Sequence, residues 1–530
     1  MSKLRPASSV DSLVRRGSIL SLLTLASRIL GLAREIVKAR LLGTSALSDS
    51  FSVAFMIPNL FRRLFAEGSI AAAFIPTFKE YLLTDGREKT REFLSSIFTF
   101  LSFFVSLAVM AGIILTPFIV SIFGMKEFDE TVFLTRLMFP FLAFISIAAL
   151  FQGILNSLHI FAPSGLAPIL LNIAIILCSY ALGSFMENPA RAMAAGVLVG
   201  GFLEAAIQFP FVIKKIRFSF FTGLAQAMKN PGTRKVLKLI IPTIVGMAAY
   251  QLNDLVSTAL AGNAGEGIVS SLQYSLRLQE LFLGVFAVSI GTVLLPDLAE
   301  FAKSGNWESY NERLISAIDI IALITIPVTF FSLAQGERLI RLLFQNHTFD
   351  ANSVGLTLAC FRFHMPGLFF IALNRILAPA FYAQSDSKSP TIAGVISFAV
   401  NMLTAAILVF PLKGTGIALA LTLASAVNTA LLLAFLRRNS QIAVARALKS
   451  ALVYSFKLAL FSCAAAVPLI YLDSRFAALF EGRGKFLGLF LPLCTGAFIY
   501  GVLGIALLLI SGDRQVQGIV RIIRRKRGKS

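Results

Sequence analysis

The residues of this chain best suited to chemistry are arginines that lie inside a hydrophobic segment. Residues 27–43 read SRILGLAREIVKARLLG, with Arg28 and Arg34 among apolar side chains and Glu35 directly after them. A charged side chain at the centre of a membrane helix costs about 2.5–3.5 kcal/mol, so its presence there indicates a function. Because a guanidinium forks onto phosphate oxygens through two hydrogen bonds, these arginines predict an anion site, with a phosphate or diphosphate as the expected ligand.

Charges inside the other apolar segments are concentrated in a few places. They are Arg62, Arg63, Glu67, Glu204, Asp254, Arg277, Glu280, Arg362 and Arg375. Ionisable residues within a membrane nearly always face a cavity or the interior of the helix bundle. Since the arginines outnumber the acids, we expect a polar cavity with a net positive charge, lined by the first, second and eighth spans.

Helical spacing predicts which of these charges can meet. Arg277 and Glu280 are three residues apart, so the two side chains can share one helix face. Arg63 and Glu67 are four residues apart and can do the same. Two arginines of the expected cavity therefore have a local acidic neighbour.

The spacing within the first segment is less favourable. Arg28 and Arg34 are six residues apart, which separates them by about 120° on an ideal helix. They converge only if the helix bends, and Gly31 between them permits a bend. Lys38 and Arg40, further along, are expected to extend toward the membrane interface, where long basic side chains reach water.

Other charges leave two interpretations open. Glu204 and Asp254 lie within spans without an obvious local partner, and each could be a buried protonated acid or a ligand of an ion. Arg362 and Arg375 could balance structural partners or take part in the site. For His159 and His347, scattered along the chain, we expect loop positions.

The elements that must position these charges are membrane helices. Of the 530 residues, 57% are hydrophobic and 14% charged, and the mean hydropathy is +0.80; soluble domains have roughly 25% charged residues. Apolar runs of 18 or more residues recur, so we expect an all-α polytopic membrane protein. The fourteen expected spans lie at roughly 17–40, 47–77, 93–118, 131–155, 165–185, 190–213, 237–261, 268–297, 314–334, 355–382, 390–411, 414–436, 451–472 and 484–511.

The formal charge of +21 is a topology signal rather than a sign of nucleic-acid binding, because the basic residues lie mostly between the apolar runs. Basic connections alternate with short or acidic ones, such as MKEFDE at 125–130. The positive-inside rule then places both termini in the cytoplasm, which requires an even number of spans. The four cysteines show no CxxC spacing, so neither a disulfide framework nor a metal site is indicated.

A weak internal repeat divides the chain. SIAAAFIPTFKE at 69–80 resembles SIGTVLLPDLAE at 289–300, an offset of 220, and the stretches at 154–168 and 376–390 match at an offset of 222. An even number of spans per repeat predicts two parallel lobes of six helices, followed by two C-terminal helices. The expected parts are a basic tail (1–16), an N-lobe (17–213), a basic linker (214–236), a C-lobe (237–436), the last two spans (437–511) and a basic tail (512–530).

Three stretches of the sequence resemble one known family. Residues 27–76, 276–296 (LRLQELFLGVFAVSIGTVLLP) and 376–390 (ILAPAFYAQSDSKSP) are similar to blocks of the MurJ (MviN) family of lipid II flippases, in the MOP exporter superfamily. The resemblance covers essentially the whole chain. It implies two lobes around a central cavity, with the last two spans forming a groove for a lipid tail.

The resemblance also implies roles for residues. The family's essential arginines correspond to Arg28, Arg34, Arg62 and Arg277, and its acidic positions to Asp49 and Glu280. Leu276, before Arg277, departs from relatives that have an acid there. As gating or supporting residues we expect Ser27, Gly31, Glu35, Arg63, Glu67 and Arg375, and a cation site would fall near Asp254 and Asn401.

The leading hypothesis is a transporter and not an enzyme. It would carry lipid II, the undecaprenyl-diphosphate-linked peptidoglycan precursor, from the cytoplasmic to the periplasmic leaflet of a bacterial inner membrane by alternating access. We expect a monomer surrounded by membrane lipids, without nucleic acid, metal or organic cofactor, and with Na⁺ or H⁺ as a candidate coupling ion. The alternatives are a flippase for another polyprenyl-diphosphate-linked glycan, such as O-antigen, and a cation-coupled multidrug exporter.

Overall fold

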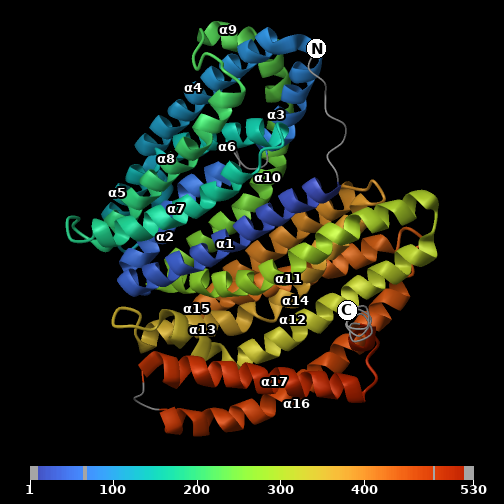
Figure 1. Ribbon diagram of the computed structural model, residues 1–530. Coiled ribbons are helices and arrows are strands. Elements are labelled where there is room, and N and C mark those ends of the chain that lie inside the picture. Colours follow the sequence, from blue (N-terminus) through green and yellow to red (C-terminus); the bar gives the residue numbers. More distant parts are fainter. Residues whose placement is uncertain (1–9, 64–68, 481–483, 519–530) are drawn as a thin grey trace. The chain divides into compact units, whose positions relative to one another are not determined.

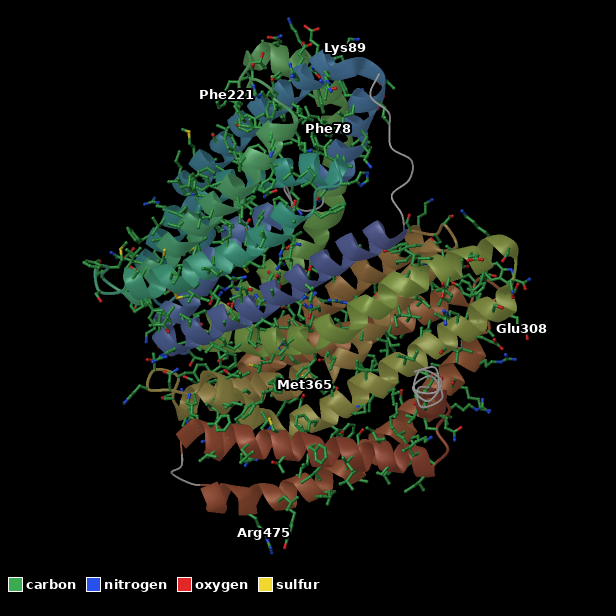
Figure 2. The ribbon with its side chains drawn as sticks, in the orientation of Figure 1. Phe78, Lys89, Phe221, Glu308, Met365 and Arg475 are labelled. Atoms are coloured by element: carbon green, nitrogen blue, oxygen red, sulfur yellow. The ribbon has the colours of Figure 1, made fainter. Side chains whose placement is uncertain are left out.

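The computed structural model describes residues 10–63, 69–480 and 484–518. Within these ranges the chain is helical and contains no strand (Figure 1). The helices form two compact units, of which the first ends at Ser270 and the second begins at Ser271. Each unit has its own buried core, and Phe78 and Met365 illustrate fully buried side chains of the first and the second (Figure 2).

Ten helices make up the first unit within the described residues. They are α1 (Val10–Leu42), α2 (Ala46–Arg62), α3 (Ser69–Glu80), α4 (Gly86–Ser121), α5 (Phe128–Met138), α6 (Phe141–Ser157), α7 (Ala162–Ala181), α8 (Pro189–Lys215), α9 (Leu224–Lys229) and α10 (Pro231–Ala264), with a π-helical turn at Tyr81–Asp85.

The second unit continues from the first turn of α11. Its helices are α11 (Ile268–Ser304), α12 (Trp307–Phe344), α13 (Ala351–His364), α14 (Gly367–Tyr382), α15 (Lys388–Leu436), α16 (Val444–Phe480) and α17 (Leu491–Ile510), with a π-helical turn at Phe486–Phe490.

The lengths and apolar composition of the helices confirm a multi-pass membrane protein. Eight helical stretches in the described residues are long and apolar enough to cross a membrane, or nine when the pair α13 and α14 counts as one bent span. That pair is bent by 45° at a short break that ends with Pro366. Proline lacks the backbone N–H that would continue the hydrogen bonds of α13, which explains the break.

The helix α10 belongs to the first unit, whereas the internal repeat predicts residues 237–261 as the first span of the C-lobe. The helix packs on α3, and Lys235 near its start forms an ion pair with Glu80 at 2.5 Å. A Cβ atom on Gly232 would lie 2.5 Å from the ring of Phe93, so the absence of a side chain there permits the close approach to α4. The two compact units therefore divide after α10.

The aromatic core of the first unit joins α3, α4 and α6. Phe74 stacks on Phe93 with ring centroids 5.8 Å apart, and Phe98 stacks on Phe151 at 6.4 Å. All four side chains are at most 6% exposed. These buried phenylalanines therefore pack the helices of this unit against one another. Their contacts hold α3 and α6 in place around the polar residues described below.

Candidate functional site

The helix α1 presents its two candidate arginines differently. The Arg28 side chain is exposed, and no hydrogen bond or ion pair joins it to the described residues. Arg34 donates a hydrogen bond to Glu35 Oε1 at 2.7 Å, and both side chains are about one-tenth exposed. The helix α1 continues through Gly31 without a break.

The packing of α1 places Ser27 on α7. Asn172 donates one hydrogen bond to the Ser27 carbonyl oxygen at 3.5 Å and another to the Pro168 carbonyl oxygen at 2.9 Å. Gly31 lies on the same side, since a Cβ atom there would be 4.0 Å from the Asn172 amide nitrogen. The two residues that we expected to support the arginines are therefore the contact between α1 and α7.

Lys38 does not extend to the membrane interface, and the sequence expectation was wrong on this residue. The side chain is 3% exposed and donates a hydrogen bond to Ser52 Oγ at 2.5 Å. Ser52 lies on α2, so the ammonium group is held between α1 and α2. Arg40, by contrast, is exposed as expected.

Asp49 caps a helix start. Its carboxylate accepts hydrogen bonds from the backbone N–H groups of Gly267 at 2.7 Å and Ser270 at 2.8 Å, and also from the Ser270 hydroxyl. The first N–H groups of a helix have no partner within the helix, so the carboxylate satisfies donors at the beginning of α11. Gly267 has φ +79°, a left-handed conformation in which any Cβ atom would also meet Thr44.

A second acid of the same loop holds the start of α2. Glu266 accepts hydrogen bonds from the Ala46 backbone at 3.1 Å and from Lys126 at 2.7 Å. The hydrogen bond from Lys126 lowers the pKa of Glu266, and the same contact raises the pKa of Lys126. The loop between α10 and α11 is therefore tied to α2 by carboxylates of both segments.

The arginines at the end of α2 have partners from different elements. Arg62 Nε donates to Asn59 Oδ1 at 2.7 Å, one turn earlier in the same helix. Arg63 contacts Asp254 at 3.3 Å and Gln251 at 3.4 Å, both on α10. The expected neighbour of Arg63, Glu67, lies outside the described residues.

In the second unit, the expected pair on α11 is confirmed. Arg277 donates to Glu280 Oε2 at 2.9 Å, and the two side chains are 41% and 57% exposed. Arg375 on α14 is exposed, whereas Asn401 on α15 is buried. Of the two expected cation ligands, Asp254 belongs to the first unit and Asn401 to the second.

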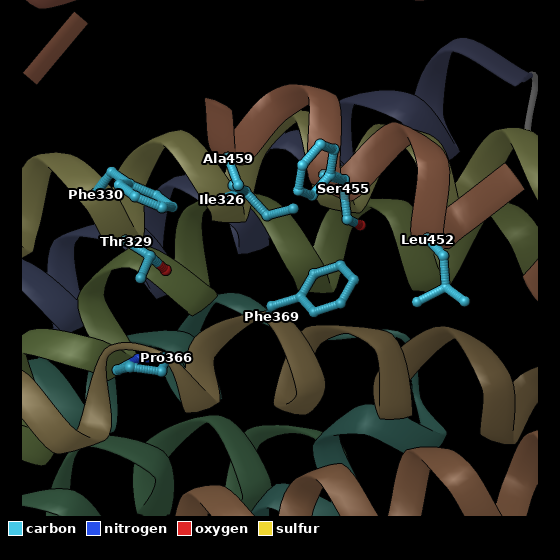
Figure 3. A pocket seen from close by; sticks show the side chains of 9 residues that line it. Ile326, Thr329, Phe330, Pro366, Phe369, Leu452, Ser455 and Ala459 are labelled. Atoms are coloured by element: carbon cyan, nitrogen blue, oxygen red, sulfur yellow. The ribbon is translucent and has the colours of Figure 1, made fainter. Parts of the chain in front are cut away.

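The second unit also contains an apolar hollow between α12, α14 and α16. It has a volume of about 570 Å³ and is lined by Ile326, Thr329, Phe330, Pro366, Phe369, Leu452, Ser455, Phe456 and Ala459 (Figure 3). Apart from two hydroxyls, these side chains are hydrocarbon. The hollow is chemically suited to an alkyl or prenyl chain and not to a charged group.

Sequence reasoning missed the residues whose partners are distant along the chain. Gln251, Glu266 and Ser270 gave no signal by themselves, because a glutamine, a loop glutamate and a serine are common in such positions. The segment GEGIVS at 265–270 contains glycines and a small hydroxyl residue at a helix start, which is typical of a cap. Its partner on α2 could not be read from that pattern.

Comparisons with known proteins agree with the fold and extend over the chain. The family model described as "Lipid II flippase MurJ" matches residues 38–487. A "Probable lipid II flippase MurJ" of Treponema pallidum (strain Nichols) is 47% identical over 97% of this chain and 99% of that protein. A protein of the same description from Vibrio cholerae is 31% identical over 78% of this chain and 81% of its own length.

Two solved structures show the same fold. One is described as "Lipid II flippase MurJ, inward closed conformation"; it is 24% identical, covers 92% of this chain and 98% of its own, and gives a TM-score of 0.76. An inward-facing multidrug resistance transporter of the MATE family, in the MOP superfamily, is 14% identical over 79% of this chain and 98% of its own, with a TM-score of 0.65. The family match and the near-complete coverage together show that this chain belongs to the lipid II flippase MurJ family.

Proposed function

We propose that this protein is a flippase that carries lipid II from the cytoplasmic to the periplasmic leaflet by alternating access. The observation that carries the proposal is the 47% identity to a probable lipid II flippase along 97% of the chain. The cationic side chains on apolar helices supply a chemical reason, because the diphosphate of such a lipid is costly to move through hydrocarbon unpaired. The protein would act as a transporter and not as a catalyst.

The substrate diphosphate would be bound by Arg28, Arg34, Arg62 and Arg277. Arg28 has no hydrogen-bond partner or ion pair among the described residues, so its charge is available to a phosphate oxygen. Glu280 would orient Arg277, to which it is paired at 2.9 Å. Asp49 would act as a gating residue through the start of α11, and Glu35, Arg63, Glu67 and Arg375 would support the site.

The prenyl tail would remain in an apolar environment. We place the groove for it along α16 and α17, the last two spans, and the hollow between α12, α14 and α16 supports an apolar surface beside α16. The polar head group would lie in a polar cavity, and the hydrocarbon tail would lie in an apolar groove. The head group then crosses without exposure to hydrocarbon.

The topology that we propose has fourteen spans and two lobes of six. Support comes from α15, where two helical segments meet at Lys413, so this helix would supply two spans in place of one. The pairs α2 with α3 and α5 with α6 would each form one span. Both termini would be cytoplasmic, in an inner membrane, and the protein would function as a monomer.

The energy source is a separate part of the proposal. Na⁺ or H⁺ would couple transport through Asp254 and Asn401. Asp254 forms an ion pair with Arg63 at 3.3 Å, so a bound cation would compete with this arginine. Transport that depends on Na⁺ in the wild type and loses the dependence in Asp254→Asn would support coupling at this site.

The first test is depletion of the native flippase in a bacterial host, followed by an assay of lipid II on the outer leaflet. Wild type should restore exposure, and Arg28→Ala should reduce it at least tenfold, because the diphosphate loses a charged hydrogen bond. Arg40→Ala is the matched control, since Arg40 is an exposed arginine on the same helix and should be replaceable. Normal exposure with Arg28→Ala would contradict the site, and no rescue by wild type would contradict the function.

A further inference from the structure

A small polar cavity lies inside the first unit, between α2, α3, α6, α7 and α8. Its volume is about 170 Å³, which is room for about five water molecules at ~30 Å³ each. The polar side chains of its lining are Arg62, Gln152, Asn156, Ser164, Glu204 and Gln208. A hollow with this lining is unusual among helices whose other buried residues are mostly apolar, so it requires an explanation.

Three oxygen atoms of the lining are buried without a hydrogen-bond partner among the described residues: Asn156 Oδ1, Ser164 Oγ and Gln208 Oε1. Gln208 is 1% exposed and Ser164 7%. The Gln208 amide nitrogen donates one hydrogen bond to the Glu204 carbonyl oxygen at 3.0 Å, whereas its oxygen accepts none from the described residues. Buried acceptors are costly without a donor, and the occupant of the cavity must therefore supply hydrogen-bond donors.

The charges of the lining argue for an uncharged occupant. Glu204 is 3% exposed, and Arg62 brings a guanidinium group to the same lining. If Glu204 is ionised, the guanidinium of Arg62 balances it, and if Glu204 is protonated, the lining is already positive. In both cases a metal cation or an ammonium group would add an uncompensated charge in a buried place. Hydroxyl and amide N–H groups donate hydrogen bonds without adding charge.

The remaining wall of the cavity is apolar. Ala148, Ala149 and Pro168 contribute hydrocarbon next to the polar side chains. A sugar ring matches this combination, because its hydroxyls lie at the edge of the ring and its faces present C–H groups. Gln152 and Pro168 are exposed, so the cavity reaches the surface of the unit and is not sealed.

We propose that this cavity binds the sugar ring that is attached to the diphosphate of the lipid-linked substrate. The inference rests on the proposed flippase function and adds the residues that recognise the sugar of the head group. Arg62, which lines the cavity, holds the diphosphate, and Asn156, Ser164 and Gln208 accept hydrogen bonds from the adjoining sugar. The cavity thus distinguishes a glycosylated lipid from a bare polyprenyl diphosphate.

The test compares two ligands on the purified full-length protein in lipid nanodiscs: lipid II and undecaprenyl diphosphate without sugar. Gln208→Met keeps the side-chain length and removes the acceptor. It should raise the Kd for lipid II about five- to tenfold, the worth of a lost hydrogen bond, and leave the Kd for undecaprenyl diphosphate unchanged. Ser164→Ala removes a single hydroxyl, should act in the same direction, and serves if Gln208→Met does not fold.

Two further variants act as controls. Asn428 on α15, in the other unit, also has a buried amide oxygen without a partner among the described residues, so Asn428→Leu should change neither Kd. Arg62→Ala should weaken both ligands, because both contain the diphosphate. These controls separate loss of the sugar contact from a general effect of removing a buried polar group.

The outcomes separate the inference from the function on which it rests. If Gln208→Met and Ser164→Ala leave the Kd values for lipid II and undecaprenyl diphosphate unchanged, or raise the two values equally, the cavity does not bind the sugar. If Na⁺ strengthens lipid II binding to the wild type but not to Gln208→Met, the occupant is a cation and the inference is overturned. If the wild type binds neither lipid, the flippase proposal fails and the inference fails with it.

Discussion

At the scale of single residues, the charges in the apolar helices differ in whether they have an acidic partner. Arg34 has Glu35 and Arg63 has Asp254, whereas Arg28 has no such partner among the described residues. An arginine that is already paired has less to gain from a phosphate than one that is not. This is why the loss of Arg28 should affect transport most directly among the arginines of the first unit.

Asp513, after the end of α17, permits a stability prediction at the same scale. Its carboxylate accepts hydrogen bonds from Lys457 Nζ at 2.9 Å and Tyr454 OH at 3.1 Å, and from two backbone N–H groups. Asp513→Ala leaves these donors without their acceptor and should cost about 2 kcal/mol of unfolding free energy. Thermal unfolding in detergent should show a lower Tm, and Glu308→Gln, at an exposed position, should not.

The same carboxylate predicts a pH dependence. Burial acts to raise the pKa of Asp513, but the hydrogen bonds from Lys457 and from the Val516 backbone outweigh it, and the pKa lies below its ordinary value. A depressed pKa means that the folded state binds the proton less well than the unfolded state. The contribution to stability is therefore present above about pH 4, the ordinary carboxyl range, and lost as the pH falls further.

A titration of Tm between pH 7 and pH 3 measures this contribution. The wild type should lose stability below pH 4 more steeply than Asp513→Ala, because only the wild type has this carboxylate to protonate. Equal slopes would mean that the contacts of Asp513 do not contribute to stability.

At the scale of elements, proline and positive φ angles interrupt the long helices. The pair α5 and α6 meets at Pro140, and α13 and α14 meet at Pro366, so each unit contains a helix broken at a proline. The short turns that follow each have one non-glycine residue with φ near 60°, His159 in the first unit and Ser385 in the second. These shared features support the internal repeat inferred from the sequence.

The kink of α15 allows a prediction about an element. Lys413 has φ 49° and ψ −129°, a conformation that costs an ordinary residue about 1–3 kcal/mol. Lys413→Gly removes this strain, and the greater freedom of glycine in the unfolded chain offsets up to about 1 kcal/mol of the gain. The net result should be a stabilisation of about 1 kcal/mol, visible as a higher Tm in detergent.

The matched variant at this position is Lys413→Val. A β-branched side chain tolerates a positive φ poorly, so Lys413→Val should lower the Tm. If glycine and valine had the same effect, the two segments of α15 would not meet in this strained conformation.

At the scale of the whole molecule, the proposed topology fixes the side of each connection. With fourteen spans, Lys229 in the basic connection should face the cytoplasm and Glu187 in an acidic connection the periplasm. In whole cells a membrane-impermeant maleimide should label Glu187→Cys strongly and Lys229→Cys only after permeabilisation. The wild-type chain, with its four free cysteines, supplies the background. Labelling of both sites in intact cells would contradict the span count.

The sequence by itself determined the class of the protein, its helical character and the residues worth testing. Apolar runs are read directly along the chain. The pairing of Arg277 with Glu280 follows from their spacing of three residues, because helix geometry determines which neighbours share a face. The near match of residues 69–80 with 289–300 likewise needed no coordinates.

Only the tertiary structure decided which distant residues meet. Arg63 pairs with Asp254, Lys38 is buried against Ser52, and α10 joins the first unit, none of which follows from spacing. The polar cavity is likewise made of five helices whose contributions are unremarkable one at a time. The physical reason is that a helix specifies its own faces, whereas the partner of each face depends on packing, which joins residues such as Asp49 and Ser270 that are 221 positions apart.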